Sequence, residues 1–192
     1  EFKDVFKEGY LPMHKAVRYT DYSVRKFFEL AKNEKWFNNT IFIFTADHGN
    51  QTYYPFYKKM INRFANPLII YSPSLKLKGV SYQLSQHLDI YPTIVDLINY
   101  NKPFRSWGQS LLSGSANDSY VVNYFGAGNY FFMDKDYIMI TNGEKAIGFY
   151  DSQDFDLENN LIDIPNSKMR QLEYKFQLFL QDYMTRICLL YT

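Results

Sequence analysis

An aspartate and a histidine stand side by side after an apolar run, where they could bind a divalent metal ion. In the run, residues 40–45, β-branched and aromatic residues alternate, and an alanine leads on to Asp47, His48 and Gly49. A hard carboxylate oxygen next to an imidazole nitrogen suits a cation such as Zn²⁺ or Mn²⁺. The same residues could form only a turn, with aspartate accepting backbone hydrogen bonds and glycine taking a positive φ. Two ligands also leave a site incomplete, because metal sites normally use roughly three or four protein groups.

The run before Asp47 is predicted to be a buried strand that brings both side chains to the rim of a sheet. Parallel α/β sheets bind ligands in the crevice beyond the carboxyl ends of their strands, so a site is expected at this rim. A long amphipathic helix is predicted before the strand, because apolar residues recur at helical spacing between Pro12 and Asn33. His14, near the start of that helix, is interpreted as a partly exposed surface histidine.

A second strand and a second helix are predicted further along the chain. Residues 67–73 form an apolar run with a proline at each end, which is typical of another buried strand. Residues 85–98 predict a helix with Asp89 as its N-cap and Pro92 in its first turn. These elements together indicate an α/β fold.

Two further residues are candidate contacts to an anionic substrate. Arg63 lies in the irregular, aromatic-rich segment 50–66. This segment follows the predicted strand of residues 40–45 and the Asp-His pair, at a place where substrate loops often lie. Its guanidinium could clamp an oxyanion, although a surface arginine is the default interpretation. His87 either bonds the local backbone or faces the rim that carries the Asp-His pair. The aromatic residues of 50–66 form a lid or pack in a core, and packing is the favoured interpretation.

The C-terminal part of the chain predicts a small antiparallel sheet covered by a helix. Short β-prone runs between residues 120 and 150 are separated by turn sequences, and Asn142-Gly143 is the strongest hairpin signal. An acidic loop over 151–163 follows, and apolar residues then recur at helical spacing from Met169 to Ile187. We expect this helix to cover one face of the sheet. The predicted parts are therefore residues 1–117 and residues 118–192.

Composition describes a globular chain without a strong charge preference. Among 192 residues, 21 Lys and Arg balance 20 Asp and Glu, so the net charge is +1 and no nucleic-acid partner is expected. A lone Cys188 cannot form an internal disulfide. Apolar runs fall far short of the ~20 residues of a membrane helix. The chain begins at Glu1 without methionine, which indicates a processed product or a cut-out piece, and we expect any membrane anchor to lie in segments outside it.

Four stretches occur in an order and spacing that together are specific to one family. They are 19–28, 39–49, 66–73 and 87–97, and with them the chain resembles the sulfatase-like arm of the alkaline phosphatase superfamily. The resemblance is closest to bacterial lipoteichoic acid synthase and phosphoglycerol transferase proteins. It implies the C-terminal part of an alkaline-phosphatase-like α/β sandwich with a small antiparallel β-meander and a C-terminal helix. Residues 1–117 would form the C-terminal half of the catalytic domain.

The resemblance also implies a shared metal site. Asp47 and His48 would hold one divalent cation (Mn, Zn, Mg or Ca) with an acidic residue and a Thr, Ser or formylglycine nucleophile from the earlier half of the domain. No strand here supplies that acid, and no nucleophile motif precedes the first helix, so no catalytic nucleophile is expected in this chain. We expect an enzyme when the protein is intact, and an inactive fragment on its own. Arg63 and His87 would contact the ester oxygens.

The implied reaction is transfer of a phosphoglycerol or phosphoethanolamine group outside the cytoplasm, in the periplasm or on the outer face of a bacterial membrane. The substrate would be a phosphate or sulfate ester, with a lipid-linked ester as one option. An Asp-His pair, where many sulfatases have Asp-Asn, favours phosphate-ester chemistry. Two alternatives remain: a sulfatase or phosphodiesterase hydrolase of the same fold, and a non-catalytic remnant or interaction module.

Overall fold

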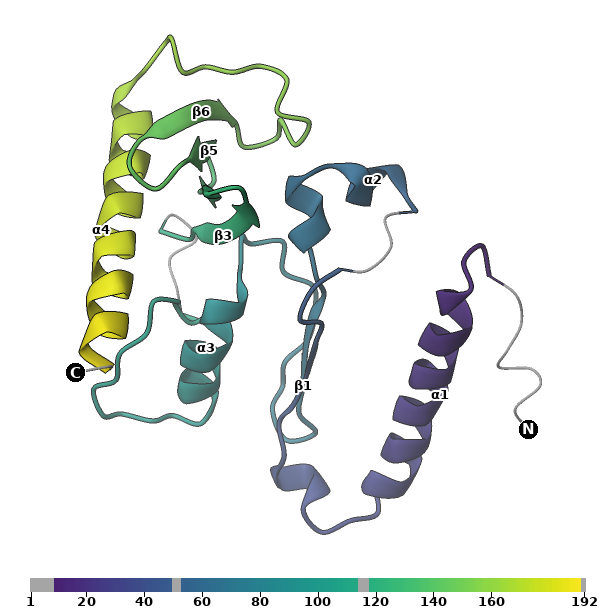
Figure 1. Ribbon diagram of the computed structural model, residues 1–192. Coiled ribbons are helices and arrows are strands. Elements are labelled where there is room, and N and C mark those ends of the chain that lie inside the picture. The colour runs from purple at the N-terminus through teal and green to yellow at the C-terminus, as the bar shows by residue number, and fades with distance from the viewer. Residues whose placement is uncertain (1–8, 50–52, 114–117, 191–192) are drawn as a thin grey trace. The chain divides into compact units, whose positions relative to one another are not determined.

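The computed structural model describes residues 9–49, 53–113 and 118–190, and its contacts divide the chain into two compact units (Figure 1). Unit 1 comprises Glu1–Gln51 and Ala65–Val80, and unit 2 comprises Thr52–Phe64 and Ser81–Thr192. This division by contacts differs from the predicted boundary between residues 117 and 118. That boundary concerns the complete domain of the intact protein, and it stays a prediction. No helix in the described ranges combines the length and the apolar composition needed to cross a membrane.

Unit 1 contains one long helix and two short strands. The predicted amphipathic helix is confirmed as α1 (Met13–Ala31), and the strands are β1 (Phe42–Thr45) and β2 (Leu68–Tyr71). A short 3-10 helix, η1 (Phe37–Asn39), precedes β1. The ring of Phe28 on α1 lies 4.9 Å from that of Phe42 and 5.7 Å from that of Tyr71. Aromatic packing therefore joins the helix to both strands.

The two strands of unit 1 pair antiparallel, so the prediction of a site at the carboxyl ends of parallel strands is wrong for this pair. Phe42 faces Tyr71 and Thr45 faces Leu68, so the end of β1 lies beside the beginning of β2. The crevice of parallel strands therefore does not form between these two strands. Asp47 and His48 follow the end of β1 as predicted, but the neighbouring strand starts there.

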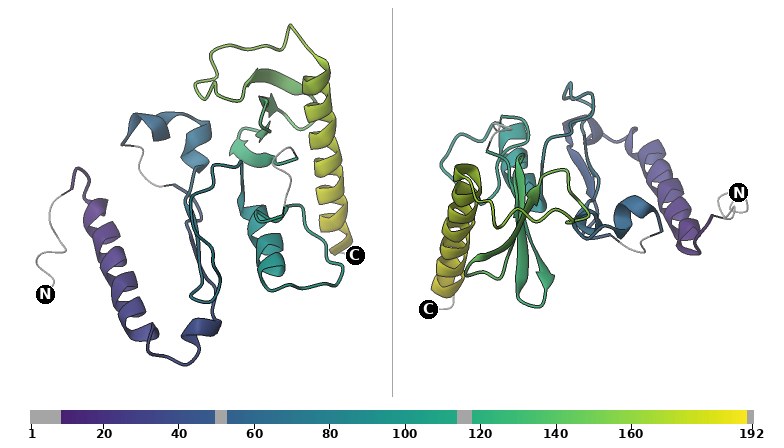
Figure 2. Two further views of the ribbon diagram at one scale, coloured as in Figure 1. Left: turned by 180° about the vertical axis from the view of Figure 1, so that it is seen from behind. Right: turned by 90° about the horizontal axis from the view of Figure 1, so that it is seen from above.

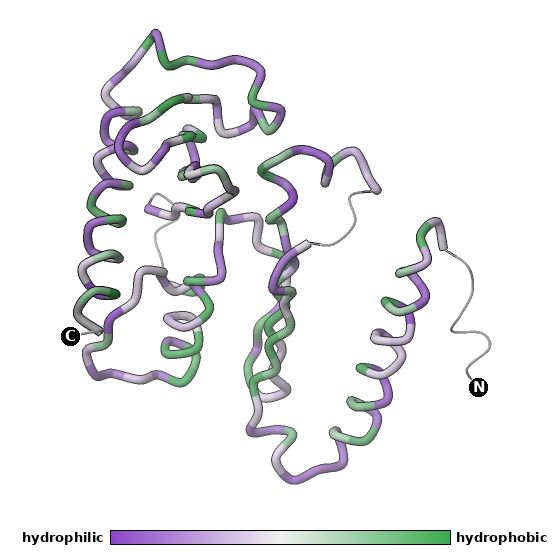
Figure 3. Tube along the Cα trace, in the orientation of Figure 1, coloured by the Kyte–Doolittle hydropathy of each residue, from purple (hydrophilic) through white to green (hydrophobic). Residues whose placement is uncertain are grey.

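The prediction that both strands are buried is wrong for the residues that the structure describes. In β1 only Phe42 is buried, and in β2 Ile69 is 56% and Tyr71 is 42% exposed. Figure 3 shows hydrophobic residues along both strands. Side chains of a strand alternate between the two faces of its sheet, and one helix in this unit cannot cover both faces.

Unit 2 is built on the predicted antiparallel meander, which is confirmed. Its strands are β3 (Val121–Gly126), β4 (Asn129–Met133), β5 (Tyr137–Thr141) and β6 (Ala146–Asp151), hydrogen-bonded in that order. The turn between β5 and β6 uses the Asn-Gly signal. Asn142 Oδ1 accepts the amide protons of residues 144 and 145, and Gly143 takes φ +93°. Such a φ favours glycine, which explains the residue at this position.

One face of the meander is covered by the C-terminal helix α4 (Ser167–Leu190), as predicted. Figure 2 shows α4 running along the sheet. The buried residues at this contact come from three strands and one helix face: Phe132, Met139, Phe149, Met169, Leu172 and Phe176. The helical spacing seen in the sequence therefore marks a real packing face.

The other face of the meander is covered by a segment that the sequence placed elsewhere. Here Ile61 joins Phe131 and Ile138 in a second buried cluster, and Phe64 packs on Phe131 with ring centroids 5.4 Å apart. The segment forms a short helix α2 (Pro55–Lys58) and a 3-10 helix η2 (Ile61–Phe64). The packing interpretation of 50–66 is therefore confirmed for Phe64 alone among its aromatic residues. Four others remain 41–51% exposed, namely Tyr53, Tyr54, Phe56 and Tyr57, and residues 50–52 lie outside the described part.

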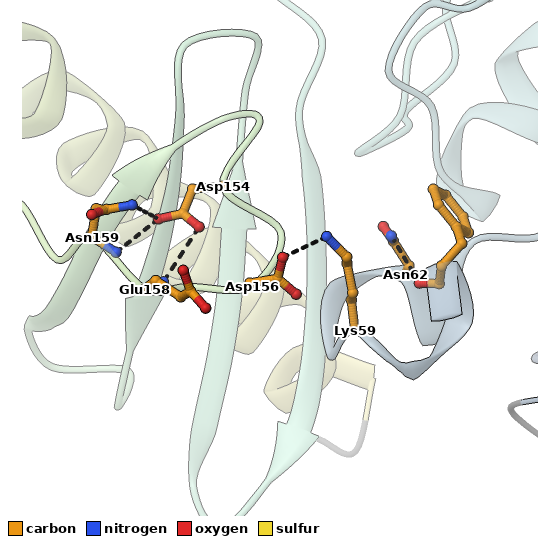
Figure 4. Close-up of polar contacts among 7 residues, drawn as sticks. Lys59, Asn62, Asp154, Asp156, Glu158 and Asn159 are labelled. Atoms are coloured by element: carbon orange, nitrogen blue, oxygen red, sulfur yellow. Dashed lines mark hydrogen bonds and ion pairs between the residues drawn. The ribbon is translucent and has the colours of Figure 1, made fainter. Parts of the chain in front are cut away.

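One polar contact joins this segment to the acidic loop, and a second lies within the segment itself. Lys59 Nζ lies 2.5 Å from Asp156 Oδ2, and Asn62 Nδ2 donates to the carbonyl of Phe56 at 3.0 Å (Figure 4). Asp154 fixes the acidic loop by accepting bonds from Glu158 and Asn159. The loop that supplies Asp156 is thus held in place by its own hydrogen bonds.

Candidate metal centre

Asp47 and His48 lie immediately beyond β1, in the bend that ends with Gly49. Both side chains are open to solvent: that of Asp47 is 87% exposed and that of His48 is 75% exposed. A short β-prone strand delivers them, and β1 ends at Thr45 where the apolar alternation stops. The structure therefore places the pair on the surface of unit 1, where a cation can reach it.

The backbone orients the carboxylate of Asp47. Its Oδ1 accepts the amide proton of His48 at 2.9 Å, an arrangement typical of aspartate in turns. The other oxygen, Oδ2, lies 3.5 Å from Nε2 of the His48 ring. One oxygen thus serves the turn and the other faces the imidazole.

The ring of His48 is oriented by Gly49. Its Nδ1 lies 2.7 Å from the Gly49 carbonyl oxygen. A carbonyl oxygen can only accept a hydrogen bond, so Nδ1 carries the proton of this contact. In the neutral imidazole the lone pair is then on Nε2, the atom that faces Asp47. In this tautomer, Nε2 and Asp47 Oδ2 can both offer lone pairs to one cation.

This donor set fits a divalent cation. In tetrahedral zinc sites with bonds of about 2.0–2.1 Å, two ligand atoms lie about 3.3–3.4 Å apart. The 3.5 Å between Asp47 Oδ2 and His48 Nε2 is close to that separation. Metal-binding histidines also usually donate their other N–H to a carbonyl or carboxylate, as His48 does to Gly49. Within the described ranges, no group of three or more His, Cys, Asp or Glu side chains could hold a metal ion. A site at Asp47 and His48 therefore needs further ligands.

The other two candidate residues belong to unit 2. Arg63 is exposed on η2, and His87 is exposed in the 3-10 helix η3 (His87–Asp89), which leads into α3 (Ile90–Leu97). The structure thus brings Asp47 and His48 together within unit 1, and it does not place Arg63 or His87 beside them.

A capping box holds His87 in place, and the sequence revealed only part of it. Asp89 is the N-cap residue of α3 as predicted, but its side chain bonds elsewhere. The two carboxylate oxygens accept the amide protons of Gln86 and Gln109, each at 2.9 Å. Gln86 Nε2 in turn donates to the carbonyl of Tyr120 at 2.9 Å. Burial raises the pKa of Asp89, and the two amide donors counter that shift only in part.

An unforeseen polar cluster attaches the chain after α3 to α4. Trp107 Nε1 donates to Asp182 Oδ2 at 2.7 Å, and Arg186 Nη2 lies 2.7 Å from the same oxygen. The hydroxyl of Tyr120 donates to the Trp107 carbonyl. Desolvation, followed by the charges of two nearby aspartates, raises the pKa of Tyr120 to about 12. No local signal marks these partners, because up to 79 residues of chain separate Trp107 from Arg186.

Comparisons with known proteins agree with this fold. Residues 13–100 match the Sulfatase family model. An arylsulfatase from Clostridium perfringens (strain 13 / Type A) is 26% identical over 198 residues, which cover 96% of this chain and 40% of that protein. A crystal structure of a protein in the alkaline phosphatase superfamily from Vibrio parahaemolyticus aligns with a TM-score of 0.69 at 20% identity. That alignment covers 94% of this chain and 45% of the other.

These matches confirm the predicted fold class. The chain has the α/β fold, with antiparallel sheets and a C-terminal helix, of a C-terminal part of an alkaline phosphatase superfamily protein. It spans less than half the length of either relative, at 40% and 45%. The family match includes the Asp-His pair and His87, since both lie between residues 13 and 100.

Proposed function

We propose that this chain is part of a metal-dependent enzyme that transfers a phosphate-ester group, such as phosphoglycerol or phosphoethanolamine, to an alcohol. The observation that carries the proposal is the geometry at the end of β1. There, Asp47 Oδ2 and His48 Nε2 face each other at 3.5 Å, and the other ring nitrogen contacts Gly49. Within this superfamily fold, such a pair suits one divalent cation held jointly with groups from the upstream half of the domain.

The residues of this chain would orient the cation. Asp47 supplies a negative oxygen whose direction is fixed because Oδ1 is engaged by a backbone amide. His48 would supply its Nε2 nitrogen, because Nδ1 is engaged by the Gly49 carbonyl. When bound, the cation would lower the pKa of an attacking hydroxyl and neutralise charge on the transferred group. The nucleophile itself is expected upstream, so this chain alone is expected to have no turnover.

Arg63 and His87 are proposed as contacts to the ester oxygens. Both side chains are exposed, which makes them accessible to an anionic substrate. His87 is held on a short helix by the Gln86–Asp89 capping box. A guanidinium can bind two oxygens of a phosphate at once, which suits Arg63 to this role.

Action outside the cytoplasm and a lipid-linked substrate also belong to this proposal. They rest on the likeness of residues 19–28, 39–49, 66–73 and 87–97 to the lipoteichoic acid synthase and phosphoglycerol transferase branch. The Asp47-His48 pair also favours phosphate-ester over sulfate-ester chemistry, because many sulfatases have an Asp-Asn pair at this place.

A second candidate function is hydrolysis of a sulfate ester. The Sulfatase family match and the arylsulfatase relative favour it. A phosphodiester and a sulfate monoester both carry one negative charge, so the charge of the substrate does not separate the two functions. The nucleophile and the acceptor do separate them.

Metal titration tests the site directly. In a chain extended by the upstream half of the domain, we expect Asp47→Ala and His48→Ala each to weaken Mn²⁺ or Zn²⁺ binding by at least tenfold, measured by calorimetry. Asp163→Ala and His14→Ala remove the same side-chain types elsewhere and should leave the affinity unchanged. If Asp47→Ala and His48→Ala also left it unchanged, both residues would be excluded from the site.

Substrate comparison then separates the two functions. The extended protein, loaded with Mn²⁺, should release p-nitrophenol from bis-p-nitrophenyl phosphate, and an added alcohol such as glycerol should appear in the product. Faster release from p-nitrophenyl sulfate, with water as the acceptor, would instead establish the sulfatase function. No turnover of either substrate by the metal-loaded protein would favour a non-catalytic module.

A further inference from the structure

A cavity in unit 2 lies between helix α3 and the loop that follows it. Its volume is about 410 Å³, which is within the range of small-molecule sites in proteins. The helix contributes Val95 and Asp96, and the chain after it contributes Tyr100, Phe104, Ser110 and Ser113. None of these residues is among those considered for the metal or the ester.

The lining of the cavity is largely polar, and a buried valine and two aromatic rings form its apolar part. Val95 is 6% exposed and closes the side of the helix, whereas Tyr100 is 47% and Phe104 is 40% exposed. Phe104 is held in position by an edge-to-face contact with Tyr91, with ring centroids 5.6 Å apart. Exposed aromatic rings of this kind provide both apolar contact and faces that attract a cation.

The charged group of the cavity is Asp96. Ser110 Oγ donates to its Oδ2 at 2.6 Å, and Ser113 Oγ donates to the same oxygen at 2.8 Å. These two hydroxyl bonds, Ser110 first, lower the pKa of Asp96, so the carboxylate stays ionised at neutral pH. Both bonds go to one oxygen, and Oδ1 accepts no hydrogen bond from the side chains and amides that the structure describes.

The negative charge in the cavity has no positive partner within it. The lining residues include no Lys, Arg or His. In the described parts of the chain, the ion pairs involve other carboxylates, and Asp96 forms none. The serine hydroxyls use their protons on Asp96, so they too offer acceptor lone pairs. The site therefore calls for a ligand that donates hydrogen bonds and carries a positive charge.

We propose that this cavity binds a small organic ammonium ion, with its nitrogen on Asp96 Oδ1 and its apolar body between Tyr100 and Phe104. A metal ion fits less well, because hard cations take six or more oxygen ligands and only one carboxylate is present. An anion would meet the Asp96 carboxylate with no compensating charge. The aromatic walls select an amine with an aromatic or aliphatic body over ammonia itself.

The competing explanation is that Ser110 and Ser113 only attach the loop to α3. Such an attachment would explain both hydroxyl bonds, but it requires neither exposed aromatic walls nor an open cavity. The two explanations differ in a measurable way, because only a binding site distinguishes a charged ligand from a neutral one of the same shape.

The test titrates three probes with a common phenyl group into the 192-residue chain. Binding is measured from the changes in its amide chemical shifts. Phenethylamine carries the positive charge, 2-phenylethanol is its neutral counterpart, and phenylacetate is an anionic counterpart. We expect phenethylamine to shift signals of residues 92–96 and 104–113, with an affinity at least tenfold above that of 2-phenylethanol. Equal affinity of the amine and the alcohol, or shifts confined to other residues, would overturn the proposal.

A variant pair tests the carboxylate. Asp96→Asn keeps an oxygen for the two serine hydroxyls but removes the charge, and should weaken phenethylamine at least tenfold while leaving 2-phenylethanol unchanged. Asp163→Asn removes an exposed carboxylate outside the cavity and should change neither. Unchanged amine affinity in Asp96→Asn contradicts the proposal. If Asp96→Asn fails to fold, Phe104→Leu provides the test instead. This variant should lower the affinity for phenethylamine, and an unchanged affinity would overturn the assignment.

Discussion

Replacing Asp89 by asparagine tests how the helix that follows His87 is held. Asp89 is 3% exposed, and its two oxygens accept the amide protons of Gln86 and Gln109 at 2.9 Å. An asparagine side chain offers one oxygen and one NH₂ group. It can therefore satisfy one amide, and its NH₂ group then meets the other amide donor to donor.

The expected cost follows from that count. A buried donor left without a partner costs about 1–3 kcal/mol. Removing a carboxylate whose burial is only partly compensated offsets some of this cost, so we expect Asp89→Asn to lower the free energy of unfolding by about 1–2 kcal/mol. Asp89→Ala leaves both amides unpaired and should cost about 2–4 kcal/mol. With a urea dependence of about 1–3 kcal/mol/M, the Ala variant should shift the unfolding midpoint by roughly 1 M or more.

The assay can report unit 2 alone. The chain has two tryptophans, Trp36 in unit 1 and Trp107 in unit 2. In a Trp36→Phe background, fluorescence during urea unfolding therefore follows Trp107. Asp163→Asn, an exposed aspartate, serves as the control and should leave the midpoint unchanged.

The stability that Asp89 contributes changes with pH in a definite direction. Burial raises the pKa of Asp89 in the folded protein. Its contribution to stability is therefore complete below the unfolded-state pKa of about 3.9 and declines as pH rises through the raised folded value. The stability gap between wild type and Asp89→Asn should narrow as pH rises from about 4 toward neutrality. A gap that widens over this range, or an unshifted midpoint for Asp89→Ala, would refute the reasoning.

Two further predictions concern the packing of unit 2. Phe176→Ala should lower its free energy of unfolding by about 3–5 kcal/mol, because Phe176 is 1% exposed, whereas Tyr174→Ala, at a site 62% exposed on the same helix, should cost far less in the same urea titration. The Tyr120 pKa of about 12 means that its contribution to stability is complete below pH 10 and lost as pH rises toward 12. Tyr120→Phe should therefore lose less stability between pH 10 and 12, and its alkaline difference spectrum should lack one late-titrating phenol.

Elements with a strong local period were predictable from the sequence. The spacing that runs from Met169 through Phe176 gave α4 its buried face, and the turn at Asn142-Gly143 fixed a hairpin between two strands. In both cases, neighbouring residues within a few positions carry the information. Local periodicity also located α1, since Pro12 and the apolar spacing after it mark where the helix begins.

Non-local contacts were not predictable in the same way. The apolar run 68–71 is the same whether it pairs parallel or antiparallel, and the structure pairs it antiparallel with β1. Ile61 and Phe64 follow β1 closely in sequence, yet they pack on Phe131, which comes about 70 residues later. Asp89 was identified at a helix start, but its second partner, Gln109, comes from a distant loop. Such partners depend on the chain path rather than on local residue types.

The candidate metal pair combines a predictable part with a part that needs the structure. Residue types alone singled out Asp47 and His48, but only the structure shows that one ring nitrogen contacts Gly49 and the other faces Asp47. The two contacts that orient the pair both lie within residues 47–49: the His48 amide on Asp47 Oδ1, and the ring Nδ1 with the Gly49 carbonyl. The tripeptide therefore sets the direction of both ligand atoms without help from the sheet or from α1.

That local control also bears on how an exposed pair could take part in the proposed metal site. At 87% and 75% exposure, the two side chains remain in water, where their attraction for a cation is strongly screened. A catalytic cation gains strength when water is excluded from its surroundings, and the described residues do not provide such an enclosure for this pair. In the proposed site, Asp47 and His48 would therefore contribute orientation, and the further ligands and the enclosure would come from groups that pack over the end of β1. Because the orienting bonds do not involve those groups, the pair can hold the same geometry before and after they arrive.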